Sequence, residues 1–150
     1  MSTDESVTKD LMQTLEDGKD GYEKAATRLE ESGHNEAATV CRKFSAQREG
    51  YYLELKNIAA TYGDSLKETG SLAGAVHRGW MALTDAVTGS SAKAVLHAAE
   101  QGDDHAVKEY DKALASDLSP TLRDIVERQR SGVQDAHDQI ERLHDQAASE

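Results

Sequence analysis

The sequence predicts an all-α protein, a four-helix bundle made of two antiparallel helical hairpins. The chain holds a single proline, Pro120, and is rich in alanine, leucine, glutamate, aspartate, glutamine and lysine. Most of these residues are good helix formers. No stretch alternates apolar and polar residues for long enough to indicate a strand. Apolar residues recur instead in steps of three or four along four long segments, as one buried helix face requires.

The first two helices are expected at about residues 6–30 and 36–62. The first carries an apolar or small stripe of Val7, Leu11, Leu15, Gly18, Tyr22, Ala25 and Leu29. Gly33 can adopt the left-handed conformation that ends a helix, and Asn35 is expected to cap the next one. The second stripe is Ala37, Cys41, Phe44, Arg48, Tyr51, Leu55, Ile58 and Tyr62. Only a few residues join these helices, so they must lie antiparallel.

The second half of the chain repeats this plan, with helices expected at about residues 91–116 and 120–146. The third stripe is Val95, Ala99, Asp103, Ala106, Tyr110 and Ala113. Ser119 followed by Pro120 is a strong start signal, a capping residue before a proline in the first helical position. The fourth stripe is Leu122, Ile125, Gln129, Val133, Ala136, Ile140 and Leu143. This connection is also short, so the pair forms a second antiparallel hairpin.

The connection between the hairpins, residues 63–90, decides how they are joined. A short helix is expected near residues 72–87, and it carries Trp80, the only tryptophan. This connection is long enough to return along a helix of about 40 Å. We therefore prefer a long crossover that makes the second and third helices parallel, which is the ferritin-like arrangement. A plain up-down-up-down bundle with the short helix folded aside is the alternative. We interpret Trp80 as a packing anchor rather than a ligand platform.

Composition narrows the cellular setting and the partners. The 150 residues make one ordinary domain, residues 1–150. Lys and Arg number 17 against 28 Asp and Glu, and the net charge of −11 argues against nucleic-acid and membrane partners. The single cysteine, Cys41, rules out an internal disulfide framework and fits a reducing compartment. No apolar run is long enough to cross a bilayer and the first ten residues show no secretory signal pattern, so we expect a cytoplasmic protein.

A polar layer is predicted near the middle of the bundle. Glycines lie near the middle of all four long helices: Gly18, Gly21, Gly50, Gly102 and Gly132. Each costs about 1 kcal/mol relative to alanine, which suggests a shared reason. The polar residues Arg48, Asp103 and Gln129 fall at inward positions near the same level. We interpret them as a network around a buried Arg48–Asp103 pair that fixes helix register, with the glycines allowing close contact. A ligand or metal pocket is the alternative.

The complete di-iron motif of ferritin-like proteins is absent. That chemistry needs an inward Glu from each of two helices and an E-x-x-H pair from each of the other two. The E-x-x-H pair occurs twice, from Glu31 to His34 in a turn and from Glu141 to His144 near the end of the last helix. Neither lies in mid-bundle. The mid-bundle carboxylates without matching histidines are Asp17, Glu100, Asp103 and Asp104.

Two weaker metal-ligand arrangements remain, each on a single helix face. They are His97, Glu100 and Asp104 on the third predicted helix, and His137, Glu141 and His144 on the fourth. Either could supply nitrogen and oxygen ligands to zinc or iron. The alternative is an exposed acidic face that is only solvated.

Other candidate sites are weaker. His77 beside Arg78 could bind an anion, and the inward Cys41 is interpreted as inert packing. The sequence contains no phosphate-binding glycine loop and no G-x-S-x-G motif.

Several segments together resemble a known family. They read DGKDGYEKAA, AQRE, GSLAGAVHRGWMAL, EQGDDHAVKEYDKAL and VERQRSGVQDAHDQI, and they cover about residues 7–143. The set resembles a bacterial, stress-associated family of ferritin-like four-helix-bundle domains of unknown function. The segment with His77, Arg78 and Trp80 is its most distinctive part. This resemblance implies a ferritin-like bundle in a bacterial cytoplasm, and it implies no reaction.

Two functional hypotheses follow from the sequence. The first, which we favour, is a non-catalytic bundle with a structural or binding role in bacterial stress physiology. It has no predicted cofactor, forms a homo-oligomer, and its protein partner is not identified. The second is a di-iron or zinc carboxylate protein of ferritin-like fold that binds Fe or Zn and handles iron, oxygen or peroxide.

Overall fold

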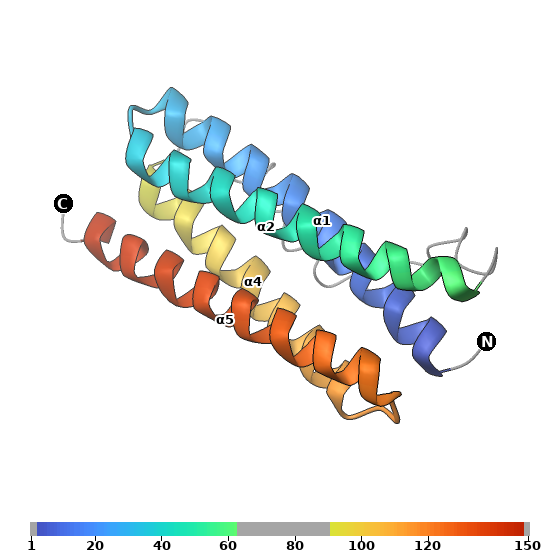
Figure 1. Ribbon diagram of the computed structural model, residues 1–150. Coiled ribbons are helices and arrows are strands. Elements are labelled where there is room, and N and C mark those ends of the chain that lie inside the picture. Colours follow the sequence, from blue (N-terminus) through green and yellow to red (C-terminus); the bar gives the residue numbers. More distant parts are fainter. Residues whose placement is uncertain (1–2, 63–90, 149–150) are drawn as a thin grey trace.

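Four long helices make up the computed structural model, which describes residues 3–62 and 91–148 (Figure 1). They are α1 (Thr3–Glu31), α2 (Asn35–Ala59), α4 (Ala92–Leu114) and α5 (Pro120–Ala148). No strand occurs in these two ranges, and the predicted all-α four-helix bundle is confirmed. The helix boundaries lie within a few residues of the expected positions. The short helix expected at 72–87, with His77, Arg78 and Trp80, lies outside the described residues.

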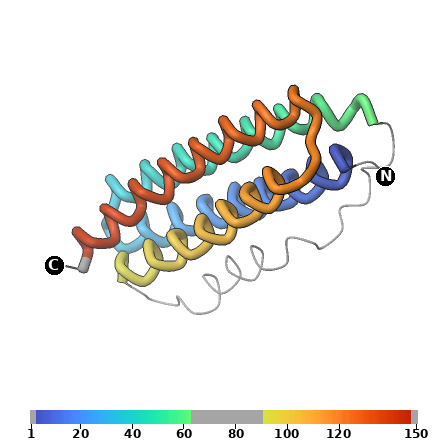
Figure 2. The backbone as a smooth tube through the Cα atoms, turned by 90° about the horizontal axis from the view of Figure 1, so that it is seen from below, coloured from blue at the N-terminus to red at the C-terminus, as the bar shows by residue number. Residues whose placement is uncertain are grey.

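The connectivity is the one that the sequence analysis preferred. Helices α1 and α2 form one antiparallel hairpin, and α4 and α5 form the other (Figures 1 and 2). Helix α2 ends and α4 begins at opposite ends of the bundle, so these two helices run parallel (Figure 1). Helix α1 packs against both α2 and α4, whereas α2 and α5 meet along a looser seam. Each neighbouring pair of these four helices is therefore antiparallel, and the plain up-down-up-down alternative is wrong.

Local signals explain most of the helix ends. Gly33 has a positive φ of 83°, and its amide donates to the Glu30 carbonyl at 3.1 Å. The His34 amide donates to the Leu29 carbonyl at 2.8 Å, which completes a Schellman C-cap. Ser119 caps α5, because its hydroxyl accepts the Leu122 amide at 3.4 Å.

The expected cap of α2 was wrong. His34, and not Asn35, is the N-cap residue of this helix, and it makes no side-chain capping hydrogen bond. Its carbonyl accepts the first helical bond, from the Ala38 amide at 3.0 Å. The reason is the shortness of the turn. Only one residue separates Gly33 from α2, so the residue after the glycine must take the capping position.

Among the described residues, the core consists of two apolar clusters, one toward each end of the bundle. One lies near the α1–α2 turn and contains Tyr22, Leu29, Phe44, Leu96 and Ile140, among others. The other lies toward the opposite end and includes Leu11, Leu15, Leu55, Leu122 and Val133. All four helices contribute to both clusters, and each helix carries polar residues between its two contributions. None of the described helices is both long and apolar enough to cross a membrane.

Candidate functional site

The polar layer between the two core clusters is built on one ion pair. Arg48 of α2 and Asp103 of α4 are 1% and 0% exposed. The Arg48 guanidinium donates from Nη1 to Asp103 Oδ1 at 2.7 Å and from Nη2 to Oδ2 at 3.3 Å. This two-pronged geometry is what a guanidinium offers and an ammonium does not. The structure therefore brings together the two residues that the sequence analysis paired.

Tyr22 of α1 completes this layer. Its hydroxyl donates to Asp103 Oδ2, and its ring lies 5.2 Å from the Arg48 guanidinium carbon. Burial raises the pKa of Tyr22 well above its ordinary value, and the negative charge of Asp103 raises it further. Burial alone would lower the pKa of Arg48, but the charge of Asp103 outweighs this effect and raises it. Tyr22 is therefore neutral and Arg48 charged, and both Asp103 oxygens are already bonded.

Gln129 belongs to a second polar network, and this placement differs from the expected single one. Its side-chain oxygen accepts a hydrogen bond from the buried Tyr110 hydroxyl at 2.7 Å. Its amide nitrogen donates to Glu54 Oε1 at 2.8 Å and to the Tyr51 carbonyl at 3.3 Å. Arg128 also bonds to Glu54. This network links α2 to α5 across the looser seam. The sequence places Tyr51 and Tyr110 in the apolar stripes of two helices, and it gives no sign that Glu54 joins them.

The mid-helix glycines do not share one reason. A β-carbon at Gly18 would lie 3.3 Å from Arg48 Nη1, so this glycine makes room for the buried guanidinium. A β-carbon at Gly132 would collide with the Tyr51 hydroxyl. Gly50 is exposed, and a β-carbon there would meet nothing within 4 Å. The expected close contact is therefore present at Gly18 and Gly132, where a neighbouring side chain takes the space, and is absent at Gly50.

Cys41 is fully buried in the cluster near the α1–α2 turn. Burial raises the pKa of its thiol to about 12, and the nearby charge of Asp103 acts in the same direction. A protonated, inaccessible thiol is a poor nucleophile, because the thiolate is the reactive form. This environment favours the interpretation of Cys41 as packing.

The candidate metal centre is formed by side chains of α4 and α5 that face each other. It combines the two His and carboxylate clusters, which the sequence placed on separate helices. We call the combined set the α4–α5 cluster: His97, Glu100 and Asp104 on α4, and His137, Glu141 and His144 on α5. Because α4 and α5 are antiparallel, the last residue of one set faces the first residue of the other. Glu100 lies between the two pairs so formed.

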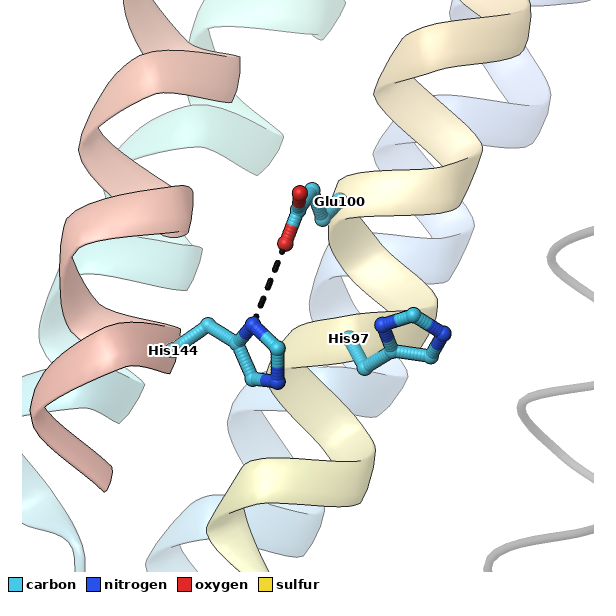
Figure 3. Close-up of side chains that lie close together, drawn as sticks. All are labelled: His97, Glu100 and His144. Atoms are coloured by element: carbon cyan, nitrogen blue, oxygen red, sulfur yellow. Dashed lines mark ion pairs between the residues drawn. The ribbon is translucent and has the colours of Figure 1, made fainter. Parts of the chain in front are cut away.

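At one end of the cluster, His97, Glu100 and His144 converge (Figure 3). One potential ligand atom from each lies within 4.8 Å of the others. His144 Nδ1 lies 3.3 Å from Glu100 Oε2, and the His97 and His144 ring centroids are 5.4 Å apart. Glu100 and His144 are about one-fifth exposed, at 19% and 20%, while His97 is exposed. Glu100 Oε2 is buried and accepts no hydrogen bond from a described residue.

At the other end, Glu100, His137 and Glu141 also offer atoms within 4.8 Å of one another. His137 Nε2 lies 2.8 Å from Asp104 Oδ1, and Nδ1 lies 3.2 Å from Asp138 Oδ1. Burial alone would lower the pKa of His137. The hydrogen bond with Asp138 and the charges of Asp104, Asp103 and Glu100 outweigh it and raise that pKa. The imidazole is thus surrounded by carboxylates.

This arrangement can hold a divalent cation. Imidazole nitrogens and carboxylate oxygens bind zinc and ferrous iron at about 2.0–2.2 Å. Ligand atoms around such an ion lie about 3.4 Å apart, so the donors would close in by roughly 1 Å. Small rotations of partly exposed side chains allow this. The buried layer offers no comparable set, because Arg48 and Tyr22 already bond to both oxygens of Asp103.

Comparison with known proteins gives a family but no described reaction. No curated protein matches the chain. A family model described as "Domain of unknown function (DUF2383)" matches residues 5–117. The match covers almost all of α1 and the whole of α2 and α4, and it stops before α5 begins. The α4 half of the candidate metal centre lies inside the matched range, and the α5 half lies outside it. Since the match spans well over half of the residues, the chain belongs to this family of domains of unknown function.

Proposed function

We propose that the protein is a non-catalytic four-helix bundle that binds a divalent metal ion, zinc or ferrous iron, through His97, Glu100 and His144. The observation that carries this proposal is the convergence of donors from two helices, with one ligand atom of each residue within 4.8 Å of the others. Two imidazoles and one carboxylate form a set typical of these metals, whereas calcium and magnesium prefer oxygen ligands alone. Three protein ligands would leave a position for water.

The non-catalytic part of the proposal rests on the buried layer. Ferritin-like di-metal chemistry is done between the helices by inward carboxylates and histidines. In this chain the inward carboxylate Asp103 is bonded to Arg48 and Tyr22. A cation placed there would have to compete with a buried guanidinium, which is strongly unfavourable. Metal binding by the partly exposed α4–α5 cluster is then a structural or storage role rather than oxygen chemistry.

The cellular setting stays a proposal that rests on composition and on resemblance. We infer a bacterial, cytoplasmic protein of ferritin-like descent with a role in stress physiology, acting as a homo-oligomer. The parallel arrangement of α2 and α4 supports the ferritin-like part, because such bundles have one long connection. Native mass measurement tests the homo-oligomer, and a purely monomeric mass would contradict it.

Metal binding is tested by calorimetric titration of the chelator-treated protein with Zn²⁺, and with Fe²⁺ under anaerobic conditions. We expect tight binding and a rise in melting temperature, since a ligand that binds only the folded state stabilises it. His144→Ala should weaken binding at least tenfold. His105→Ala is the matched control, a histidine of α4 outside the cluster, and should bind as the wild type does. Absence of binding, or equal binding by His144→Ala, would overturn the proposal.

A further inference from the structure

We propose that the α4–α5 cluster holds a second metal position, made by Glu100, His137 and Glu141, and that Glu100 bridges the two ions. This inference rests on the proposed function, because it adds a position beside the one already assigned. Glu100 is the residue common to both convergent groups of donors. The first group adds His97 and His144, and the second adds His137 and Glu141.

The antiparallel packing of α4 and α5 places the two positions next to each other. His144 and His137 are seven residues apart on α5, two helical turns, and Glu141 lies between them on the same face. Glu100 faces this stretch from α4, so one carboxylate can reach toward both histidines. Its two oxygens allow one bond to each ion. Carboxylate-bridged pairs of ions in proteins lie about 3.5–4 Å apart, which suits a single shared residue.

The charge of the cluster favours two ions over one. The cluster contains three carboxylates, Glu100, Asp104 and Glu141, against three histidines. One divalent ion would leave an excess of negative charge in the cluster. Asp104 already contacts His137 Nε2 at 2.8 Å. Its carboxylate therefore lies close enough to bind a second ion together with that imidazole. Glu100 Oε2 is buried and contacts His144 Nδ1 at 3.3 Å, so it already lies beside a ligand of the first position.

The experiment is a count of zinc per chain on the full-length protein. The protein is saturated with Zn²⁺, passed through a desalting column and analysed for zinc by elemental analysis. We expect about two ions per chain for the wild type and for the control His105→Ala. His137→Ala should retain about one, and Glu100→Gln should retain essentially none. Circular dichroism checks that each variant keeps its helices.

Bridging is tested separately with Cu²⁺ as a paramagnetic probe. Two copper ions about 4 Å apart give a spin-coupled spectrum with a half-field signal in electron paramagnetic resonance. We expect this signal in the wild type and its loss in His137→Ala, which should show an isolated copper ion. A wild type with no metal would overturn the proposed function itself. A wild type with one zinc, unchanged by His137→Ala, would overturn only the second position. Two uncoupled copper ions would overturn the bridge.

Discussion

At the scale of single residues, the Arg48–Asp103 pair is the most consequential contact in the bundle. Removing two charges from water is costly, and here the cost is offset by two hydrogen bonds between them and a third from Tyr22. Loss of one partner leaves the other charge buried without compensation. The contribution of the pair to stability is therefore asymmetric. Breaking it should cost far more than replacing both residues together.

We expect Arg48→Met to lower the free energy of unfolding by roughly 3–5 kcal/mol, because Asp103 stays buried and unpaired. The double variant Arg48→Met, Asp103→Leu should lose less than this single variant. Urea denaturation followed by circular dichroism measures both. A single variant as stable as the wild type, or a double variant less stable than the single, would contradict the role of the pair.

The glycines provide a matched test of packing. Gly50→Ala should raise the free energy of unfolding by about 1 kcal/mol, because alanine is the better helix former and the site is open. Gly18→Ala gains the same helix propensity, but its β-carbon would lie only 3.3 Å from Arg48 Nη1 and would crowd the guanidinium. We expect it to be less stable than Gly50→Ala in the same urea assay. Equal stabilisation by both changes would show that Gly18 makes no room for Arg48.

At the scale of helices, the α2–α5 seam is held by polar contacts. Glu54 receives hydrogen bonds from Arg128 and Gln129, and Gln47 Nε2 donates to the Gly132 carbonyl at 3.4 Å. Burial alone would raise the pKa of Glu54, but the bonds from Arg128 and Gln129 outweigh it and lower that pKa. Its contribution to stability is therefore present above the ordinary glutamate pKa. It is lost as the pH falls through the lowered value.

This linkage gives a pH-dependent prediction. Glu54→Gln should be less stable than the wild type at pH 7, by about 1 kcal/mol at most, because the pair with Arg128 is partly exposed. The difference should shrink toward zero in acid, once Glu54 of the wild type is protonated. Urea midpoints of both proteins, measured from neutral to strongly acidic pH, test this. A difference that stays constant or grows in acid would contradict it.

How far the sequence predicts each element depends on whether its signals are local. Helix periodicity, the Gly33 turn and the Ser119–Pro120 start are local, and the corresponding helices and turns were predicted. Gln129 was assigned to the wrong network because its partners, Tyr110 and Glu54, come from two other helices. The candidate metal centre was predicted only as two separate halves. Its assembly depends on the register between α4 and α5, which residue spacing within one helix does not contain.

At the scale of the whole molecule, α5 closes both core clusters. Its Leu122, Val126, Val133 and Ile140 are essentially inaccessible to solvent. The matched range of the family model ends at residue 117, before any of them. We expect a fragment of residues 1–117 to lack a cooperative transition, since the apolar faces of three helices would be left open to water.

Thermal melting followed by circular dichroism compares this fragment with the full chain. The full chain should show one sigmoidal transition and the fragment a shallow, gradual loss of helix. A sharp transition in the fragment would show that three helices suffice for the fold.

The Arg48–Asp103 contact joins diagonal helices, and these belong to different hairpins. It therefore acts as an interlock between the two halves of the chain. Sliding one half along the other by a helical turn, about 5.4 Å, would separate the two charges within an apolar interior. Two copies that exchanged halves would have to rebuild the same contact between chains. Arg48 and Asp103 would then join the two subunits of a domain-swapped dimer in the way that they join the two halves of one molecule.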